Sequence, residues 1–223
     1  SELLRHPLSW YQKLGVELHL GQRISAVDPE NKTITVNEGR KVEYDKLLLA
    51  MGSLPSIPPI QGIDKPGVLT WRTLDDTLEM EKVALTCQDV IVVGGGLLGL
   101  EAARGLKSFC GNLTVLEYFP RLMPRQLDEQ AANLLQDYVE SMGIKVIVNA
   151  HTERVIGEER VKGVHLERGV DLPAQTIVCA AGVQPNKRIA KEAGIETNRG
   201  VIVDNHMMTS DPEIYAAGDI AEY

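Results

Sequence analysis

The sequence predicts an α/β fold built from two related units, one complete and one partial. The first observation behind this prediction is a continuous apolar run, Asp89–Val93, followed by three glycines and a stretch of helix formers. The second is a regular order of strand, helix and strand that continues to Val148. The third is an earlier stretch of chain with the same pattern as the closing half of this unit. Apolar strands that alternate with helices are typical of doubly wound parallel sheets.

The complete unit consists of a strand, a glycine turn, and then alternating helices and strands. Apolar residues recur at helical spacing between Leu127 and Met142, and Gly143 stands where a helix cap belongs. This order defines a Rossmann-like unit. The expected elements, in chain order, are a strand at 89–93, a helix ending near 109, a strand at 113–117, a helix at 127–142, and strands at 144–148, 152–156, 160–166 and 175–182.

An internal repeat accounts for the first part of the chain. Trp10–Leu18 matches Tyr138–Val146, because each contains a helix end, a glycine and an alternating strand. Each copy continues with two short strands, a glycine turn and an apolar strand that ends in Ala-x-Gly, which is Ala50-Met51-Gly52 in the first copy. Because order, length and terminal residues agree, we interpret the first copy as the second half of another unit.

The first unit is therefore expected to lack its opening strand, glycine turn and helix, roughly forty residues judged by the complete copy. The proline-rich stretch Ser53–Gly62 has the composition of a connector, and Thr209–Tyr223 appears after the complete unit as a return to the first. On this interpretation the chain is a fragment of a larger protein. The expected domains are a truncated unit formed by 1–72 and 184–223, and a complete unit at 73–183 inserted between them.

Composition excludes several functional classes. With 43% hydrophobic residues the chain is too apolar for a disordered protein, and it has no apolar run long enough to span a membrane. The net charge of −8 and the aromatic content of 4% argue against nucleic acid as a partner. The three cysteines are far apart and form no Cys-x-x-Cys, which fits a reducing cytoplasm. The five histidines show no ligand spacing, so no metal site is expected.

The glycine turn after the apolar strand is a candidate phosphate site. Gly94, Gly96 and Gly99 follow a predicted strand and open a predicted helix, which is the context that the Gly-x-Gly-x-x-Gly pattern requires. Gly94 would make the tight turn, Gly96 would let the backbone approach a pyrophosphate, and Gly99 would allow close packing of helix and strand. Leu98 at the helix start and Gly182 after the closing strand complete the expected nucleotide site.

Glu117 ends the second strand about twenty residues beyond the glycines, where an acid accepts a hydrogen bond from a ribose 2′-hydroxyl of NAD. A solvated carboxylate at a strand end is the alternative. The charge of Glu117 would repel the 2′-phosphate of NADP, although Arg121 lies close enough in sequence to leave NADP open. We therefore expect NAD(H) to be favoured over NADP(H).

The C-terminal segment carries a second motif. Ile214–Ala217 has the pattern of a short buried strand that ends in Gly218-Asp219. This segment resembles the Gly-Asp motif of FAD/NAD-dependent pyridine nucleotide oxidoreductases of the two-dinucleotide-domain type. The resemblance implies that Asp219 holds the ribityl chain of FAD. Ala50 begins a segment similar to their Ala-Thr-Gly motif, with Met51 in place of the usual threonine.

Further positions follow from the same resemblance. Trp71–Asp76 is similar to the Arg-Thr-x-x-Asp segment that opens the NAD domain of these enzymes, and its arginine, Arg72, contacts FAD in some members. Ile24 matches the position whose backbone meets the adenine of FAD. Glu101 matches an acid near the nicotinamide in several members, with an exposed helix glutamate as the alternative.

Within that family, Gly94–Ala103 and Pro120–Asp128 most resemble the flavoprotein region of the large subunit of bacterial NAD(P)H-dependent nitrite reductase. The resemblance implies an enzyme that passes hydride from NADH to FAD and electrons onward to an acceptor domain or protein, with no catalytic side chain assigned. Rubredoxin or ferredoxin reductases, NADH oxidases and CoA-disulfide reductases remain alternatives, as does a non-catalytic NAD-binding module. Neither nucleic acid nor a membrane is expected as a partner, and a homodimer is left open.

Overall fold

The computed structural model describes residues 6–167 and 169–223, and these form two compact units with the α/β architecture that the sequence predicts. Unit 1 contains the described residues up to Gly52 and those from Pro185 onward, and unit 2 contains Ser53 to Gln184. The first five residues of the expected domain 1–72 lie outside the described residues. β6 (Val68–Thr70), which falls within the expected domain 1–72, pairs with the central sheet of unit 2.

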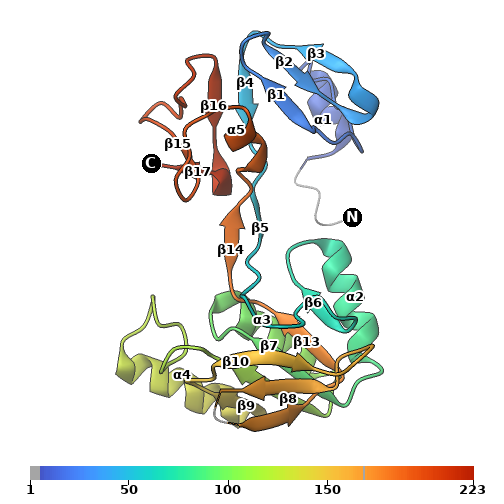
Figure 1. Cartoon of the computed structure of the whole chain (residues 1–223), viewed down its shortest axis with the longest axis vertical. Helices are drawn as coiled ribbons and strands as arrows, with labels where there is room; N and C mark the ends of the chain where they lie inside the picture. The colour runs from blue at the N-terminus through green and yellow to red at the C-terminus, as the bar shows by residue number, and fades with distance from the viewer. Residues whose placement is uncertain (1–5, 168) are drawn as a thin grey trace. The chain divides into compact units, whose positions relative to one another are not determined.

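A five-stranded parallel sheet is the centre of unit 2 (Figure 1). Each neighbouring pair of strands runs parallel, so the carboxyl ends of all these strands lie at one edge of the sheet. The strands are mostly apolar, as expected for a parallel sheet with both faces covered. In spatial order they are β6, β13 (Thr176–Cys179), β7 (Asp89–Val93), β8 (Asn112–Leu116) and β9 (Ile144–Ile147).

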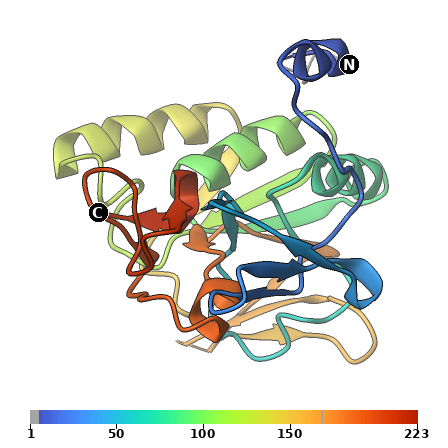
Figure 2. The same cartoon turned by 90° about the horizontal axis from the view of Figure 1, so that it is seen from above.

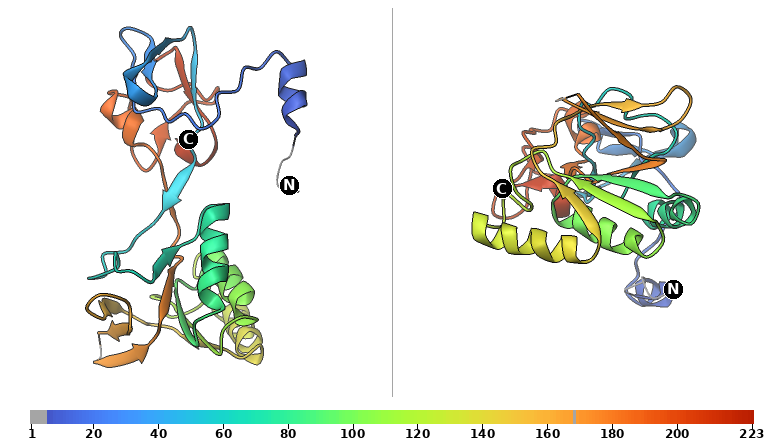
Figure 3. Two further views of the ribbon diagram at one scale, coloured as in Figure 1. Left: turned by 90° about the vertical axis from the view of Figure 1, so that its right-hand side faces the viewer. Right: turned by 90° about the horizontal axis from the view of Figure 1, so that it is seen from below.

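The two faces of this sheet carry different layers (Figures 2 and 3). Helices cover one face, and an antiparallel sheet covers the other. Val90 and Val92 pack with the helices, whereas Ile91 and Val93 pack with the antiparallel sheet, since side chains alternate along a strand. The helices are α2 (Leu74–Ala84), α3 (Leu97–Lys107) and α4 (Glu129–Ser141), and the antiparallel strands are β10 (Thr152–Ile156), β11 (Gly163–Leu166) and β12 (Val170–Pro173).

Unit 1 is built from shorter strands around a core of its own. Its antiparallel sheet consists of β1 (Ala26–Asp28), β2 (Thr33–Thr35) and β3 (Lys41–Glu43). The returning chain supplies parallel neighbours, so that β16 (Ile214–Ala216) lies beside β4 (Leu47–Leu49) and β17 (Ala221–Glu222) beside β15 (Val201–Ile202). The remaining elements are α1 (Leu8–Lys13), α5 (Arg188–Glu192) and the 3-10 turns η1 (Asn37–Gly39) and η2 (Gly218–Ile220).

The internal repeat has a structural counterpart. The sheets β1–β2–β3 and β10–β11–β12 are both antiparallel with their strands in chain order, and each is followed by a strand of a parallel pair, β4 or β13. Gly15 and Gly143 both follow a helix with positive φ, 70° and 78°. The copies differ at residues 16–18, where the sequence predicts a strand and the structure has none. A strand requires a paired neighbour, and no described strand lies beside these residues.

Two short strands connect the body of unit 2 to the rest of the chain. They are β5 (Ser53–Pro55) and β14 (Val183–Pro185), which pair with each other. The backbone N–H of Ser56 donates a hydrogen bond of 2.9 Å to the carbonyl of Gly182, so the two ends of unit 2 meet. Among the residues that the structure describes, no helix has both the length and the apolar composition needed to cross a membrane.

Candidate functional site

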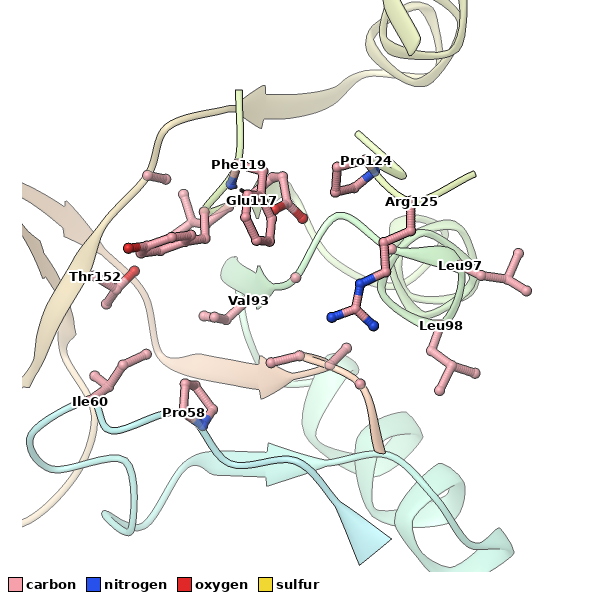
Figure 4. Close-up of a pocket in the computed structure, with 18 of the residues that line it drawn as sticks. Pro58, Ile60, Val93, Leu97, Leu98, Glu117, Phe119, Pro124, Arg125 and Thr152 are labelled. Atoms are coloured by element: carbon pink, nitrogen blue, oxygen red, sulfur yellow. Dashed lines mark hydrogen bonds between the residues drawn. The ribbon is translucent and has the colours of Figure 1, made fainter. Parts of the chain in front are cut away.

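Unit 2 contains a pocket of about 460 Å³ at the carboxyl edge of its parallel sheet. The ends of β7, β8 and β13, the start of α3 and the loop after β8 surround it (Figure 4). In open α/β sheets, ligands bind in the crevice beyond the carboxyl ends of the strands. The pocket brings together the expected nucleotide residues Gly94, Gly96, Leu98, Glu117 and Gly182, whereas Gly99 lies behind its lining.

The glycine turn between β7 and α3 forms one side of this pocket. Gly94 has a φ of 120°, and a Cβ there would collide with the backbone of Ala180. A Cβ on Gly99 would collide with the carbonyl oxygen of Gly94, so this glycine lets α3 cross close to the turn. Gly96 has no heavy atom within 4 Å of the place where a Cβ would stand. The turn is therefore tightly packed at its base and open to the pocket at Gly96.

The N-terminus of α3 faces the pocket without a side chain that caps it. Gly96 is the N-cap residue, and the first turn of the helix contains no acid. The first N–H groups of an α-helix have no acceptor within the helix and carry a partial positive charge. A phosphate group is the ligand that such a terminus favours.

Glu117 is buried just after β8, with 5% of its surface exposed. Its Oε2 accepts a hydrogen bond of 2.7 Å from the backbone N–H of Gly95, and its Oε1 accepts one of 2.8 Å from the N–H of Phe119. A carboxylate can accept about four hydrogen bonds, so the group retains capacity for a ligand hydroxyl. The sequence predicts an acid that faces a ligand, but it gives no signal that the same acid binds the glycine turn.

The two arginines of the loop after β8 have different surroundings. Arg121, which sequence proximity suggests as a phosphate ligand, instead donates from Nε to the Leu127 carbonyl and from Nη2 to the Pro124 carbonyl, each at 3.2 Å. Arg121 does not line the pocket. Arg125 does, and its guanidinium points into the pocket (Figure 4). The sequence interpretation missed Arg125, because no motif or spacing distinguishes it from Arg121.

Aromatic side chains form the end of the pocket next to β8 and β10. Tyr118 and Phe119 pack edge to face with ring centroids 5.4 Å apart, and Tyr118 stacks on His151 at 4.3 Å. The Nδ1 atom of His151 lies 2.7 Å from Oε2 of Glu167, which fixes the ring of the histidine. Exposed aromatic rings provide a surface on which a flat base can stack.

The residues expected to contact FAD fall in both units. In unit 1, β4 and β16 are parallel neighbours, so Ala50 and Asp219, which follow them, lie at the same edge of that sheet. Ile24 precedes β1 in the same unit, while Arg72 lies in unit 2 just before α2. Within the described part of unit 1, no α-helix follows a parallel strand through a glycine turn as α3 follows β7.

Other candidate groups do not form a site. No three His, Cys, Asp or Glu residues in the described ranges lie close enough together to hold a metal ion. All three cysteines are buried, and burial raises the pKa of the Cys110 and Cys179 thiols, which keeps them protonated at neutral pH. Glu101 is exposed on α3 and does not line the pocket.

Known proteins are similar in sequence to this chain over nearly its whole length. The chain is 41% identical to the NAD(P)H nitrite reductase of Bacillus subtilis (strain 168) over 214 residues, which are 96% of this chain and 27% of that protein. It is 34% identical to the ferredoxin–NAD(+) reductase component of the biphenyl dioxygenase system of Paraburkholderia xenovorans (strain LB400), over 96% of this chain and 53% of that protein. The chain thus spans about a quarter to a half of the length of these relatives.

A solved structure has the same fold. The ferredoxin reductase for the CYP199A2 system of Rhodopseudomonas palustris matches with a TM-score of 0.93 and 32% identity, over 98% of this chain and 54% of that one. The family described as pyridine nucleotide-disulphide oxidoreductase, whose members use FAD and NAD(P)H, matches residues 6–223. This chain therefore belongs to the pyridine nucleotide-disulphide oxidoreductase family.

Proposed function

We propose that this chain provides the NADH site, and part of the FAD site, of an enzyme that passes hydride from NADH to FAD and electrons onward. The observation that carries the proposal is the composition of the pocket in unit 2. An uncapped helix N-terminus and the open position at Gly96 stand beside the carboxylate of Glu117 and the guanidinium of Arg125. Phosphates and ribose hydroxyls are the ligand groups that match this set.

Each end of the dinucleotide has a proposed place in this pocket. The backbone at Gly94, Gly96 and Leu98 receives the pyrophosphate, with Gly99 keeping the helix close enough for this contact. Glu117 accepts a hydrogen bond from the adenosine ribose, which favours NADH because a 2′-phosphate would meet a like charge. Gly182 borders the pocket where β13 ends, on the route toward the nicotinamide.

The residues proposed to contact FAD are Ile24, Ala50, Arg72 and Asp219. The parallel pairing of β4 with β16, which sets Ala50 and Asp219 at one sheet edge, supports a shared ligand for these two. FAD, when bound, supplies the hydride acceptor. This chain's own residues contribute binding and orientation, and no side chain is assigned as an acid or base.

For the whole protein we propose a large subunit of the nitrite reductase type, on the strength of the 41% identity to such a protein. The electron acceptor is then a further domain or a partner protein. A ferredoxin reductase is the second candidate, supported by the 34% identity and by the structural match. Oxidation of NADH by the full-length protein separates the two. It is measured once with nitrite as the electron acceptor and once with oxidised ferredoxin.

Nucleotide binding to the chain itself tests the site. We expect NADH and ADP-ribose, which lacks the nicotinamide, both to bind in titration calorimetry. Gly96→Ala is the informative variant, because Gly96 has ordinary backbone angles (φ −82°, ψ −176°) and the new methyl group would fill only the open side of the turn. Gly105→Ala, on an exposed position of the same helix with open space around it, is the matched control. Unchanged nucleotide affinity in Gly96→Ala would show that the pyrophosphate does not bind at this turn.

A further inference from the structure

Three hydrogen bonds join the glycine turn to the end of β8 and to the loop after it, and one of these involves a side chain. The N–H of Gly94 donates to the Leu116 carbonyl at 2.8 Å, and the N–H of Met123 donates to the Gly95 carbonyl at 3.0 Å. The third bond, of 2.7 Å, joins the N–H of Gly95 to Oε2 of Glu117. The N–H of Gly95 is therefore held by a carboxylate, whereas its carbonyl is held by the backbone of Met123.

The surroundings of Gly95 leave little freedom for any other arrangement. A Cβ on Gly95 would come within 2.6 Å of Leu122 Cδ2 and within 2.9 Å of both Cβ and Oε2 of Glu117. Leu122 is fully buried, and Glu117 is held on its other side by the N–H of Phe119 at 2.8 Å. A glycine is therefore required at position 95 for steric reasons, although the Gly-x-Gly-x-x-Gly pattern allows any residue there.

We infer that Glu117 is a positioning residue for the phosphate-binding turn, in addition to any contact it makes with a ribose. Its carboxylate turns the Gly95 N–H inward, away from the ligand, and so sets the direction in which Gly96 and the first turn of α3 present their N–H groups. This inference rests on the proposed nucleotide site. It predicts that loss of the carboxylate weakens binding even of a nucleotide with no 2′-hydroxyl for Glu117 to bind.

A pair of ligands separates the two roles of Glu117. NADH and its analogue without the 2′-hydroxyl on the adenosine ribose are titrated into the unmodified chain and into Glu117→Gln. The glutamine has the same shape, but its amide accepts through one atom only, so it can keep one of the two backbone hydrogen bonds and not both. We expect Glu117→Gln to bind the 2′-deoxy analogue about fivefold or more weakly than the unmodified chain, the effect of losing a modest hydrogen bond.

The opposing result is equally clear. If Glu117 acts only through the 2′-hydroxyl, the unmodified chain and Glu117→Gln will bind the 2′-deoxy analogue with equal affinity, and the inference is then wrong. Failure of the proposed function looks different, since the unmodified chain would bind neither ligand.

Hydrogen exchange without ligand provides a second measurement. In the unmodified chain both the Gly94 and the Gly95 amides should be protected. In Glu117→Ala, which removes both acceptor atoms, we expect the Gly95 amide to exchange at least about tenfold faster, while the Gly94 amide, bonded to a backbone carbonyl, keeps its protection. Retained protection at Gly94 shows that the variant is folded, and unchanged protection at Gly95 would overturn the inference.

A variant that leaves Glu117 in place offers an independent test. Gly95→Ala adds a methyl group against the Glu117 carboxylate and Leu122, and should weaken NADH and the 2′-deoxy analogue by similar factors. Gly105→Ala again serves as the control, with unchanged affinity for both. Weakening of NADH alone in Gly95→Ala would speak against a role in the turn.

Discussion

The guanidinium of Arg121 holds the carbonyl oxygen of Leu127, with a distance of 3.2 Å between Nε and that oxygen. A second bond of the same length, from Nη2 to the Pro124 carbonyl, closes the loop around the side chain. Arg121 therefore stabilises the loop that carries Arg125, and Arg125 is the residue left to meet a ligand in the pocket.

We predict that Arg125→Met weakens nucleotide binding and that Arg121→Met mainly lowers stability. Methionine keeps most of the apolar stem and removes the charge, so the loss at Arg125 should be about 1 kcal/mol in binding free energy, roughly fivefold, and should shrink at high salt. Calorimetry at two salt concentrations, with urea unfolding alongside, measures both effects. A larger loss of affinity for Arg121→Met than for Arg125→Met would contradict this division.

Cofactor preference is predicted to follow Glu117. The unmodified chain should bind NADH more tightly than NADPH, and Glu117→Ala should weaken NADH more than NADPH, by roughly 1.5–3 kcal/mol for a hydrogen bond to a charged group. Because Glu117 also binds Gly95 N–H, the affinity for NADPH should fall rather than rise in this variant. Calorimetry with both nucleotides decides this, and equal or tighter NADPH binding by the unmodified chain would refute the assignment.

Replacement by alanine should have different effects on stability and nucleotide affinity at the N-cap of α3, Gly96, and at Gly99 and Gly105 within the helix. Gly99→Ala places a methyl group against the Gly94 carbonyl and should cost about 1–3 kcal/mol of stability, as overpacking does. Gly96→Ala should leave stability nearly unchanged while it reduces nucleotide affinity. Gly105→Ala should raise stability by up to about 1 kcal/mol, because alanine is the better helix former at an exposed position. Thermal unfolding and calorimetry together give this pattern, and equal behaviour of all three variants would be inconsistent with it.

The start of α2 carries a pH-dependent contribution to stability. Burial raises the pKa of Asp76, but hydrogen bonds from the N–H groups of Thr73 and Arg72 outweigh it, and the pKa lies below its ordinary value. The stabilisation is thus present above the unfolded pKa of about 3.9 and is lost as the pH falls through the lower folded pKa. Asp76 is half-buried at the surface, so solvent still screens its charge and the effect is modest.

Asp76→Asn should therefore be less stable than the unmodified chain at neutral pH, by roughly 0.5–1 kcal/mol, the usual range for a helix cap. The difference should shrink at acid pH, because the protonated acid resembles the amide once the pH has fallen through the lowered folded pKa. Urea unfolding at both pH values measures this. Asp75→Asn, a neighbouring acid in the same first turn, is the control for charge alone. A difference that persists at low pH would exclude the carboxylate as its source.

The 223-residue chain is predicted to carry no tightly bound FAD. Ile24, Ala50, Arg72 and Asp219 are the residues proposed to contact FAD, but within the described part of unit 1 no α-helix follows a parallel strand through a glycine turn to hold a pyrophosphate. The visible absorbance of the purified chain measures flavin content, and NADH binding in the same sample reports the state of unit 2. A stoichiometric flavin spectrum would contradict this prediction.

Much of unit 2 could be predicted because its sequence patterns are local. The apolar strand Asp89–Val93, the glycines after it and the helical spacing at 127–142 each follow from neighbouring residues, and the structure forms β7, α3 and α4 there. Residues 16–18 show the limit of such patterns, since an alternating segment becomes a strand only when another strand lies beside it.

The site was predictable in its backbone and not in its side-chain contacts. The glycine spacing indicates a turn at Gly94 and an open position at Gly96, and both depend on residues next to each other in sequence. The contact of Glu117 with Gly95, and the inward direction of Arg125 rather than Arg121, depend on how the loop after β8 folds back over the turn. The spacing of apolar residues in the sequence does not indicate how this loop folds.

The hydrogen bond between Ser56 and Gly182 holds the two ends of unit 2 next to each other. Because β5 and β14 pair, the polypeptide enters and leaves unit 2 at adjacent points (Figure 1). A module with touching ends can be inserted into a host loop, or removed from it, without stretching the host backbone. Residues 53–184 are for this reason suited to domain insertion into another protein, or to circular permutation with new termini made elsewhere and β5 joined to β14.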